Sequence, residues 1–431
     1  MQQPDRSTRP SFKTTQKLSY IEPRQWTLNN GAQVHFLEGG EEGLVRLDFL
    51  FPAGHAFGDS VLEVELTNSL MKEGTRSFSS AEIADKLDYY GADLSNGVNK
   101  DKGLLSLITL EKHLPRVLPV LQEIIREPVF SEQEFEIKKT IRKRRFNIDR
   151  QKVKILARDR FTEVLFGDHP YGLTMNEEEF DTLTAEGLRS FYKHHYIPSQ
   201  SQIIMSGQVA GQSLQEVDAF LGNSRGEEPK TDFSEAKPFH SHAEKQHRMQ
   251  KDGALQTAIR MGRVLFNKNH PDFMKMQVLS TILGGYFGAR LMSNLREDKG
   301  YTYGIGSALV SFNQTGVFLI VSEVGNGVKE AALKEIRYEI ERLQKEPVPG
   351  HELTIVKNYM TGSLLKNFDG PFAHAETLHG LVDYGLDFSY FEDYLMTIQN
   401  ITQEEIMELA NKYLRLDDLY EVVAGDFKQG E

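Results

Sequence analysis

The sequence predicts an α+β protein of two duplicated lobes, each a mixed, mostly antiparallel sheet with helices packed on it. With 431 residues, the chain is long enough for two or more domains of ordinary size. Segments with strand periodicity and segments with helix periodicity follow one another in the same order twice. Two blocks also recur in register, because Arg126-Glu127-Pro128-Val129 matches Lys345-Glu346-Pro347-Val348, and 134–139 matches 352–357. Sheets with helices layered on them, present in two copies, are therefore the expected architecture.

The first half begins with a hairpin at 26–37, because Asn30-Gly31 between alternating apolar residues is a strong turn signal. The elements expected after it are strand 45–51, helices 60–71 and 80–90, strands 93–99 and 103–110, helix 114–126, a long helical region at 130–165, helix 184–194 and strand 202–208. The second half is expected to hold strand 257–263, helices 272–283 and onward to 296, strands 303–312 and 316–323, helix 328–344 and a further helix from 351.

These patterns divide the chain into four parts. The expected boundaries are a disordered lead at 1–16, an N-terminal domain at 17–210, a linker at 211–247 and a C-terminal domain at 248–431. The linker is predicted from mixed charge, Gly, Pro and Ser with weak periodicity.

The composition excludes several classes of function. A net charge of -12 with scattered basic residues argues against a nucleic-acid protein, which needs a concentrated positive surface. The absence of cysteine excludes disulfides, thiolate metal sites and cysteine nucleophiles. The start lacks an apolar leader, and no apolar run has the length of a membrane span. We expect a soluble protein with no membrane partner, cytoplasmic or, if a signal peptide has been removed, periplasmic.

The corner formed by Arg296 and Tyr303 is the candidate for chemistry. A helix with apolar residues at helical spacing carries Arg296 near its end, Gly300 stops it, and a strand follows in which Tyr301 and Tyr303 are expected on one face. A guanidinium beside a phenol hydroxyl suits the binding of a carbonyl oxygen that gains negative charge. The alternative is structural, with the arginine complementing the helix dipole and the tyrosine packing. From the residues alone the structural role has the better support.

Five features in this order resemble the pitrilysin or insulinase (M16) family of zinc peptidases, from Trp26 onward. They are Pro52-Ala53-Gly54, Gly74-Thr75, the block 166–170, Tyr196-Ile197-Pro198 and the corner of Arg296 and Tyr303. The resemblance is to the bacterial type built from two separate chains, and it implies a LuxS/MPP-like metallopeptidase fold.

The zinc motif of that family is altered in this chain. The family has H-x-x-E-H on a helix ahead of the Gly-Thr pair, with two histidine ligands and a glutamate that activates water. Here the segment reads Glu65-Leu66-Thr67-Asn68-Ser69, so both histidines are lost and Asn68 replaces the general base. The family's third ligand, a glutamate, aligns with Arg144-Arg145-Phe146, where a guanidinium repels a cation. We therefore expect no metal and no cofactor in this lobe.

No other histidines show ligand spacing in the sequence. His374 and His379 with Glu376 come nearest to a cluster, but residues five apart do not share a helical face, so a solvated or capping role has the better support. The remaining histidines considered lie in predicted turns or the linker: His55, His113, His169, His194, His195, His240, His242 and His247.

A basic helical region at 138–154, including Arg142 and Arg145, is the exception to the acidic balance. A solvated face balanced by neighbouring acids is the preferred interpretation. The alternative is that this helix, with Arg142 and Arg145, binds acidic stretches of a peptide substrate or docks against an acidic surface of a partner by long-range attraction.

Taken together, the resemblance implies the subunit that lacks zinc in a two-chain peptidase. Arg296 would bind substrate backbone or the oxyanion, Tyr303 would donate a hydrogen bond to the oxyanion, and a homologous partner subunit would carry the zinc. Alone, the chain is expected to hydrolyse nothing. Two alternatives stay open: a structural scaffold like the M16-like core subunits of respiratory complexes, and a peptide-binding protein that captures extended peptides on exposed strand edges.

Overall fold

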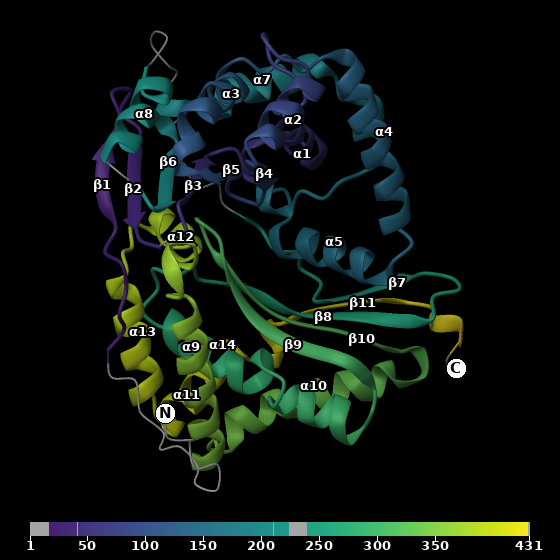
Figure 1. Cartoon of the computed structure of the whole chain (residues 1–431). Coiled ribbons are helices and arrows are strands. Elements are labelled where there is room, and N and C mark those ends of the chain that lie inside the picture. Colours follow the sequence, from purple (N-terminus) through teal and green to yellow (C-terminus); the bar gives the residue numbers. More distant parts are fainter. Residues whose placement is uncertain (1–16, 41, 210, 224–238, 430–431) are drawn as a thin grey trace, which may run out of the picture.

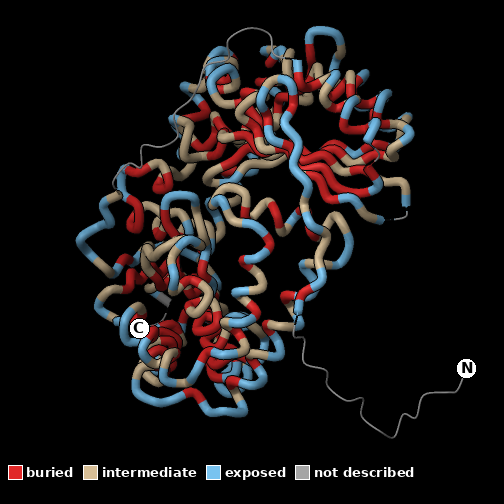
Figure 2. The backbone as a smooth tube through the Cα atoms, turned by 90° about the vertical axis from the view of Figure 1, so that its left-hand side faces the viewer, coloured by how far each residue is buried: buried red, intermediate tan, exposed pale blue. Residues whose placement is uncertain are grey.

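The computed structural model describes residues 17–40, 42–209, 211–223 and 239–429, and these form two lobes (Figures 1 and 2). The predicted disordered lead at 1–16 lies outside the described residues. Buried residues gather inside each lobe, on the strands and on the inward faces of the helices (Figure 2). The predicted α+β fold of two sheet-and-helix lobes is confirmed.

The N-terminal lobe holds a six-stranded sheet in the order β1-β2-β6-β3-β5-β4. Only β2 and β6 run parallel; the other neighbours are antiparallel. The strands are β1 (Arg24–Thr27), β2 (Gln33–Glu38), β3 (Leu44–Phe51), β4 (Asp93–Val98), β5 (Gly103–Leu110) and β6 (Gln202–Gly207). The helices that follow in this half are α1 (Val61–Leu70), α2 (Ser80–Tyr89), α3 (Leu114–Arg126), α4 (Glu132–Asp149), α5 (Val153–Phe166), α6 (Glu179–Thr182), α7 (Ala185–His195) and α8 (Gly211–Leu221).

The C-terminal lobe repeats this topology in a five-stranded sheet of order β7-β11-β8-β10-β9. Here β7 and β11 are parallel, as β2 and β6 are in the first sheet, and the other neighbours are antiparallel. The strands are β7 (Gln246–Gln250), β8 (Gln256–Leu265), β9 (Thr302–Ser311), β10 (Gly316–Gly325) and β11 (Tyr420–Gly425). The helices are α9 (Phe273–Ser280), α10 (Lys329–Lys345), α11 (Gly350–Lys366), α12 (Gly370–His379), α13 (Ser389–Asn400) and α14 (Gln403–Tyr413). Without β1, the two strand orders correspond one to one, so the duplication read from two sequence blocks extends to the whole sheet.

Each half lends one helix to the sheet of the other half (Figure 1). Helix α5 buries Ala157, Phe161 and Val164 against Ala258 and Val422 of the C-terminal sheet. Conversely, α12 buries Ala375 and Leu378 against the N-terminal sheet, where they meet Leu37, Leu50 and Ile204. The other face of each sheet carries that lobe's own helices and the larger core. The exchange joins the lobes through apolar contacts on both sides.

Two elements differ from the sequence prediction. The helical region expected at 130–165 is two helices, because α4 ends at Asp149 and α5 begins at Val153 after a turn. The range 211–247, predicted as a linker, contains α8, whose Leu214, Val217 and Leu221 join the N-terminal core. Weak periodicity concealed this helix because it is short. Among the helices of the described residues, none is both long and apolar enough to cross a membrane.

Candidate functional site

The corner that carries Arg296 is built from a helical turn, a glycine and a strand. The turn Met292–Asp298 has π-helical geometry, and Lys299 and Gly300 close it by donating from their backbone N–H groups to Asn294 and Arg296. Gly300 has φ of +64°, a left-handed conformation that glycine adopts without strain. Strand β9 then begins at Thr302. The predicted sequence of helix end, glycine stop and strand is confirmed.

A β-bulge in the pairing of β9 with β10 turns Tyr303 away from the core. The register shifts between Ser322 and Val324, and the Thr302 hydroxyl donates to the carbonyl of Glu323 at 2.7 Å. Tyr301 packs against the C-terminal core, whereas Tyr303 is 86% exposed. The prediction that both tyrosines share a face is wrong, because a bulge interrupts the alternation of the strand.

The Arg296 guanidinium lies between two aromatic rings. Its central carbon is 4.7 Å from the ring centroid of Tyr303 and 5.0 Å from that of Phe287, while its Nε lies 3.5 Å from Glu297. Cation–π attraction therefore fixes the guanidinium over the phenol ring rather than beside its hydroxyl. Phe287 is 62% exposed, and the sequence analysis missed it because the glycines around it indicate a turn.

Tyr303 lines a pocket of about 440 Å³ on the face of the C-terminal sheet that α5 partly covers. Lys154 from the start of α5 and Arg260 from β8 also line the pocket, and Glu323 lies 3.9 Å from the Lys154 ammonium. Burial lowers the pKa of Arg260, but its usual value is so high that the guanidinium keeps its charge near neutral pH. The Tyr303 hydroxyl has no hydrogen-bond partner within the described residues. The pocket thus offers cationic groups and a phenol donor to a polar ligand.

The residues at the altered zinc motif are engaged with one another and with the fold. The Glu65 carboxylate accepts from Nε of Arg142 at 2.6 Å, so an ion pair joins α1 to α4. The Asn68 amide nitrogen donates to the Tyr196 hydroxyl at 3.0 Å and the Leu104 carbonyl at 3.2 Å. Ser69 stands at the position of the second histidine of the motif, and its side chain has no nitrogen that could bind a metal. A carboxylate held by a guanidinium, a bonded amide and a hydroxyl do not fit zinc.

The histidine group on α12 serves helix docking. His379 Nε2 lies 2.9 Å from the Asp48 carboxylate, and Glu376 pairs with Arg46 at 2.6 Å. His374 accepts a hydrogen bond from the backbone N–H of Ile21 at 3.0 Å. The sequence favoured a solvated or capping role for these histidines, but His374 is buried and the His379 side chain is only 15% exposed, because both rings hold α12 against the N-terminal half.

The basic residues on α4 are largely paired. Besides Arg142, Arg145 contacts Asp149 at 3.0 Å with its side chain 64% exposed. Lys138 pairs with Glu73 at 2.6 Å. This pattern is that of a solvated face balanced by acids, and of the two arginines Arg145 is the more open to solvent.

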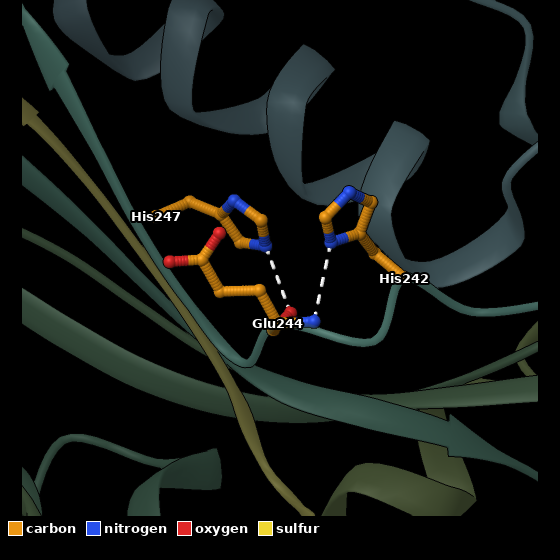
Figure 3. Close-up of side chains that lie close together, drawn as sticks. All are labelled: His242, Glu244 and His247. Atoms are coloured by element: carbon orange, nitrogen blue, oxygen red, sulfur yellow. Dashed lines mark hydrogen bonds between the residues drawn. The ribbon is translucent and has the colours of Figure 1, made fainter.

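A second group of possible metal ligands was missed by the sequence analysis. His242, Glu244 and His247 form the one such cluster in the described part of the chain, although the sequence indicated no ligand spacing for these histidines (Figure 3). They come together because the chain bends between residues 242 and 247. Spacing rules for helices do not detect ligands that a bend brings together.

Comparisons with known proteins agree with this structure. Residues 65–177 match the family model described as Insulinase (Peptidase family M16), and 182–360 match the one described as Peptidase M16 inactive domain. A peptidase M16 inactive domain from Pseudomonas fluorescens aligns with a TM-score of 0.85 and 25% identity, covering 94% of this chain and 98% of that one. A protease from Helicobacter pylori aligns with a TM-score of 0.81 at 19% identity, covering 94% and 99%.

Among sequence relatives, the uncharacterized zinc protease YmxG of Bacillus subtilis is 23% identical over 69% of this chain and 72% of its own length. The probable inactive metalloprotease YmfF of the same organism is 22% identical over 84% of this chain and 89% of its own. The chain belongs to the peptidase M16 family. It is a homologue of the inactive domain of that family, and no zinc site is established in its described residues.

Proposed function

We propose that this chain is the catalytically incomplete subunit of a heterodimeric M16-type peptidase, which supplies substrate binding and oxyanion stabilisation to a homologous zinc-bearing partner. The partner's zinc supplies the activated water for peptide hydrolysis. This chain's own residues bind and orient the peptide bond. The chain alone hydrolyses nothing.

The observation that carries this proposal is the exposed corner of Arg296 and Tyr303 beside its pocket. A tyrosine in a protein of this size is usually packed or hydrogen-bonded, but the bulge presents Tyr303 at 86% exposure. The arginine stacks on the phenol ring, which limits the conformations of both side chains before substrate arrives. Preorganised donors of this kind stabilise charge that develops in a transition state. Tyr303 donates to the oxyanion, and Arg296 binds the substrate backbone or the same oxyanion.

Arg142 and Arg145 are proposed as further contacts to acidic parts of the substrate. Arg142 already pairs with Glu65, so Arg145, with its exposed side chain, has the greater freedom to act. Arg145→Glu should weaken the binding of acidic peptides at low salt and lose this effect at high salt. A variant with unchanged salt dependence contradicts this contact.

The proposed assembly is tested by purifying the chain from its native cells with a mild affinity tag. A stoichiometric partner of similar length that carries the intact H-x-x-E-H motif, with peptidase activity in the mixture only, is the expected result. Recovery in a large assembly without peptidase activity identifies a scaffold, and recovery with peptide but no protein partner identifies a peptide binder. Either outcome contradicts the proposal.

A further inference from the structure

We propose that His242, Glu244 and His247 bind a divalent cation, best matched by zinc, which fastens the segment between the lobes to the C-terminal sheet. This site lies apart from the altered motif at Glu65, because its residues lead into β7 at the edge of the other sheet. It also lies apart from Tyr303 on β9, at the opposite edge of that sheet. The inference therefore does not rest on the proposed peptidase role.

The three side chains converge in a short turn. One possible ligand atom from each residue lies within 4.8 Å of the others, and the two imidazole centroids are 5.0 Å apart (Figure 3). The backbone N–H of Glu244 donates to Nδ1 of His242 at 3.3 Å, and because this nitrogen is the one that faces His247 in Figure 3, a cation bound to it must displace that contact. Two imidazoles with one carboxylate form a donor set that zinc uses in proteins, with a fourth position left for water.

The surroundings fix the turn firmly in place. The backbone N–H of His242 donates to the Val164 carbonyl at 2.8 Å, near the end of α5. The carbonyl of His242 accepts from the Tyr420 hydroxyl at 2.6 Å, and that of Lys245 accepts from the backbone N–H of Glu421 at 2.7 Å. The Lys245 ammonium lies 3.9 Å from the Tyr420 ring centroid. Ligand positions are thus held from both α5 and β11, which lowers the ordering cost of binding.

Arg160 competes with a cation for the imidazole of His247, a residue that is only 7% exposed. One terminal nitrogen of Arg160 lies 3.2 Å from Nδ1 of this ring, while Nε2 lies 3.0 Å from the Glu244 carbonyl. A cation bound by either nitrogen must displace one of these contacts. Arg160 can withdraw because it also meets Glu163 at 3.3 Å.

The test is a calorimetric titration of the chelator-treated full chain with zinc ions alone. The expected result is one zinc per chain. His242→Ala and His247→Ala should each weaken it by at least about 100-fold, since loss of a ligand exceeds the loss of a supporting residue. Arg160→Gln should tighten binding several-fold, because it removes a competing positive charge. His240→Ala, at an exposed histidine two residues away, is the matched control and should bind like the wild type.

Two further readouts separate binding from folding. Zinc should raise the melting temperature of the wild type and of His240→Ala, but not that of His242→Ala, which alters an exposed side chain. Circular dichroism should show that all variants fold. Absence of saturable binding, or equal affinity in the wild type and both ligand variants, overturns the proposal. Peptide hydrolysis plays no part in this titration, so failure here leaves the peptidase proposal intact, and the converse also holds.

Discussion

At the corner of Arg296 and Tyr303, the arginine packs against aromatic rings and the tyrosine is exposed to solvent. Arg296 lies between two rings with its side chain 30% exposed, and Tyr303 offers its hydroxyl to solvent. The stack satisfies much of the cation's attraction without using its hydrogen-bond donors. The Arg296 Nε also lies 3.5 Å from the Glu297 carboxylate, a long contact that leaves the terminal nitrogens for the proposed contact to a substrate carbonyl.

Two partly buried histidines, His55 and His195, predict a specific dependence of stability on pH. Burial, reinforced by Lys100 for His55 and by His194 for His195, lowers both pKa values from 6.5 to about 4. The unfolded chain therefore takes up protons first, and the free energy of unfolding should fall as pH drops from about 6.5 towards about 4.

Urea unfolding at several pH values measures this dependence. His55→Gln should show a shallower loss of stability than the wild type over the same pH window, because one of the two imidazoles with a lowered pKa is gone. His240→Gln, at an exposed position, serves as the control and should keep the wild-type slope. Identical slopes for His55→Gln and the wild type would show that His55 titrates normally in the folded protein.

At the residue scale, the loss of the zinc ligands could be predicted from the sequence, whereas the geometry of the corner at Arg296 and Tyr303 could not. Glu65, Asn68 and Ser69 could be predicted not to hold zinc, since their chemistry follows from residue type. The outward turn of Tyr303 could not be predicted, because it depends on a bulge between β9 and β10, and the stack of Phe287 on Arg296 could not be predicted, because the glycines around Phe287 indicate only a turn. A bulge has no signature in the alternation of a single strand.

At the scale of elements, α12 is held to the N-terminal sheet by charge as well as by apolar contact. Asp48 is fully buried between Arg46, Ser106 and His379. Burial alone raises the pKa of this carboxyl, but the bonds from His379, Arg46 and Ser106 outweigh that effect and hold the pKa below its usual value. The charged form is therefore part of the folded structure.

Removing this carboxylate should cost far more stability than removing a surface one. Asp48→Ala leaves Arg46 with its side chain only 11% exposed and without its buried partner, and should lower the free energy of unfolding by about 3–5 kcal/mol. Glu38→Ala breaks the exposed pair with Arg24 in the same sheet and should cost less than about 1 kcal/mol. Similar small losses in urea denaturation of the two variants would refute a role for Asp48 in docking.

The sequence could not predict on which sheet α5 and α12 pack. Helical periodicity shows which face of a helix is buried, but it does not identify the sheet that receives that face. Because each helix crosses to the sheet of the other half, its partners lie far away in sequence. The duplication itself could be predicted, since the order of elements is a local property.

On the scale of the whole molecule, the exchanged helices should keep the two halves together after the chain is cut. A protease site introduced between residues 224 and 238 would separate the halves covalently, yet α5 would stay on the C-terminal sheet and α12 on the N-terminal one. Gel filtration of the cleaved protein should give a single peak of the original size, and urea should release two fragments. Two peaks without denaturant would contradict the mutual exchange.

The same organisation keeps the M16 fold intact although the zinc motif is altered. Both lobes retain the M16 fold, and the motif region keeps its place through an ion pair and amide hydrogen bonds. The surface that bears Tyr303 is thus held by an intact scaffold, although the first lobe has lost its metal ligands.

The most direct test of this division of labour is the turnover number of the purified mixed complex carrying Tyr303→Phe. Loss of one oxyanion donor should reduce kcat about 100- to 1,000-fold, with assembly and the partner's zinc content unchanged. Tyr338→Phe, at an exposed tyrosine that also has an arginine over its ring, is the control and should match the wild type. A kcat for Tyr303→Phe within about threefold of the wild type would contradict the account.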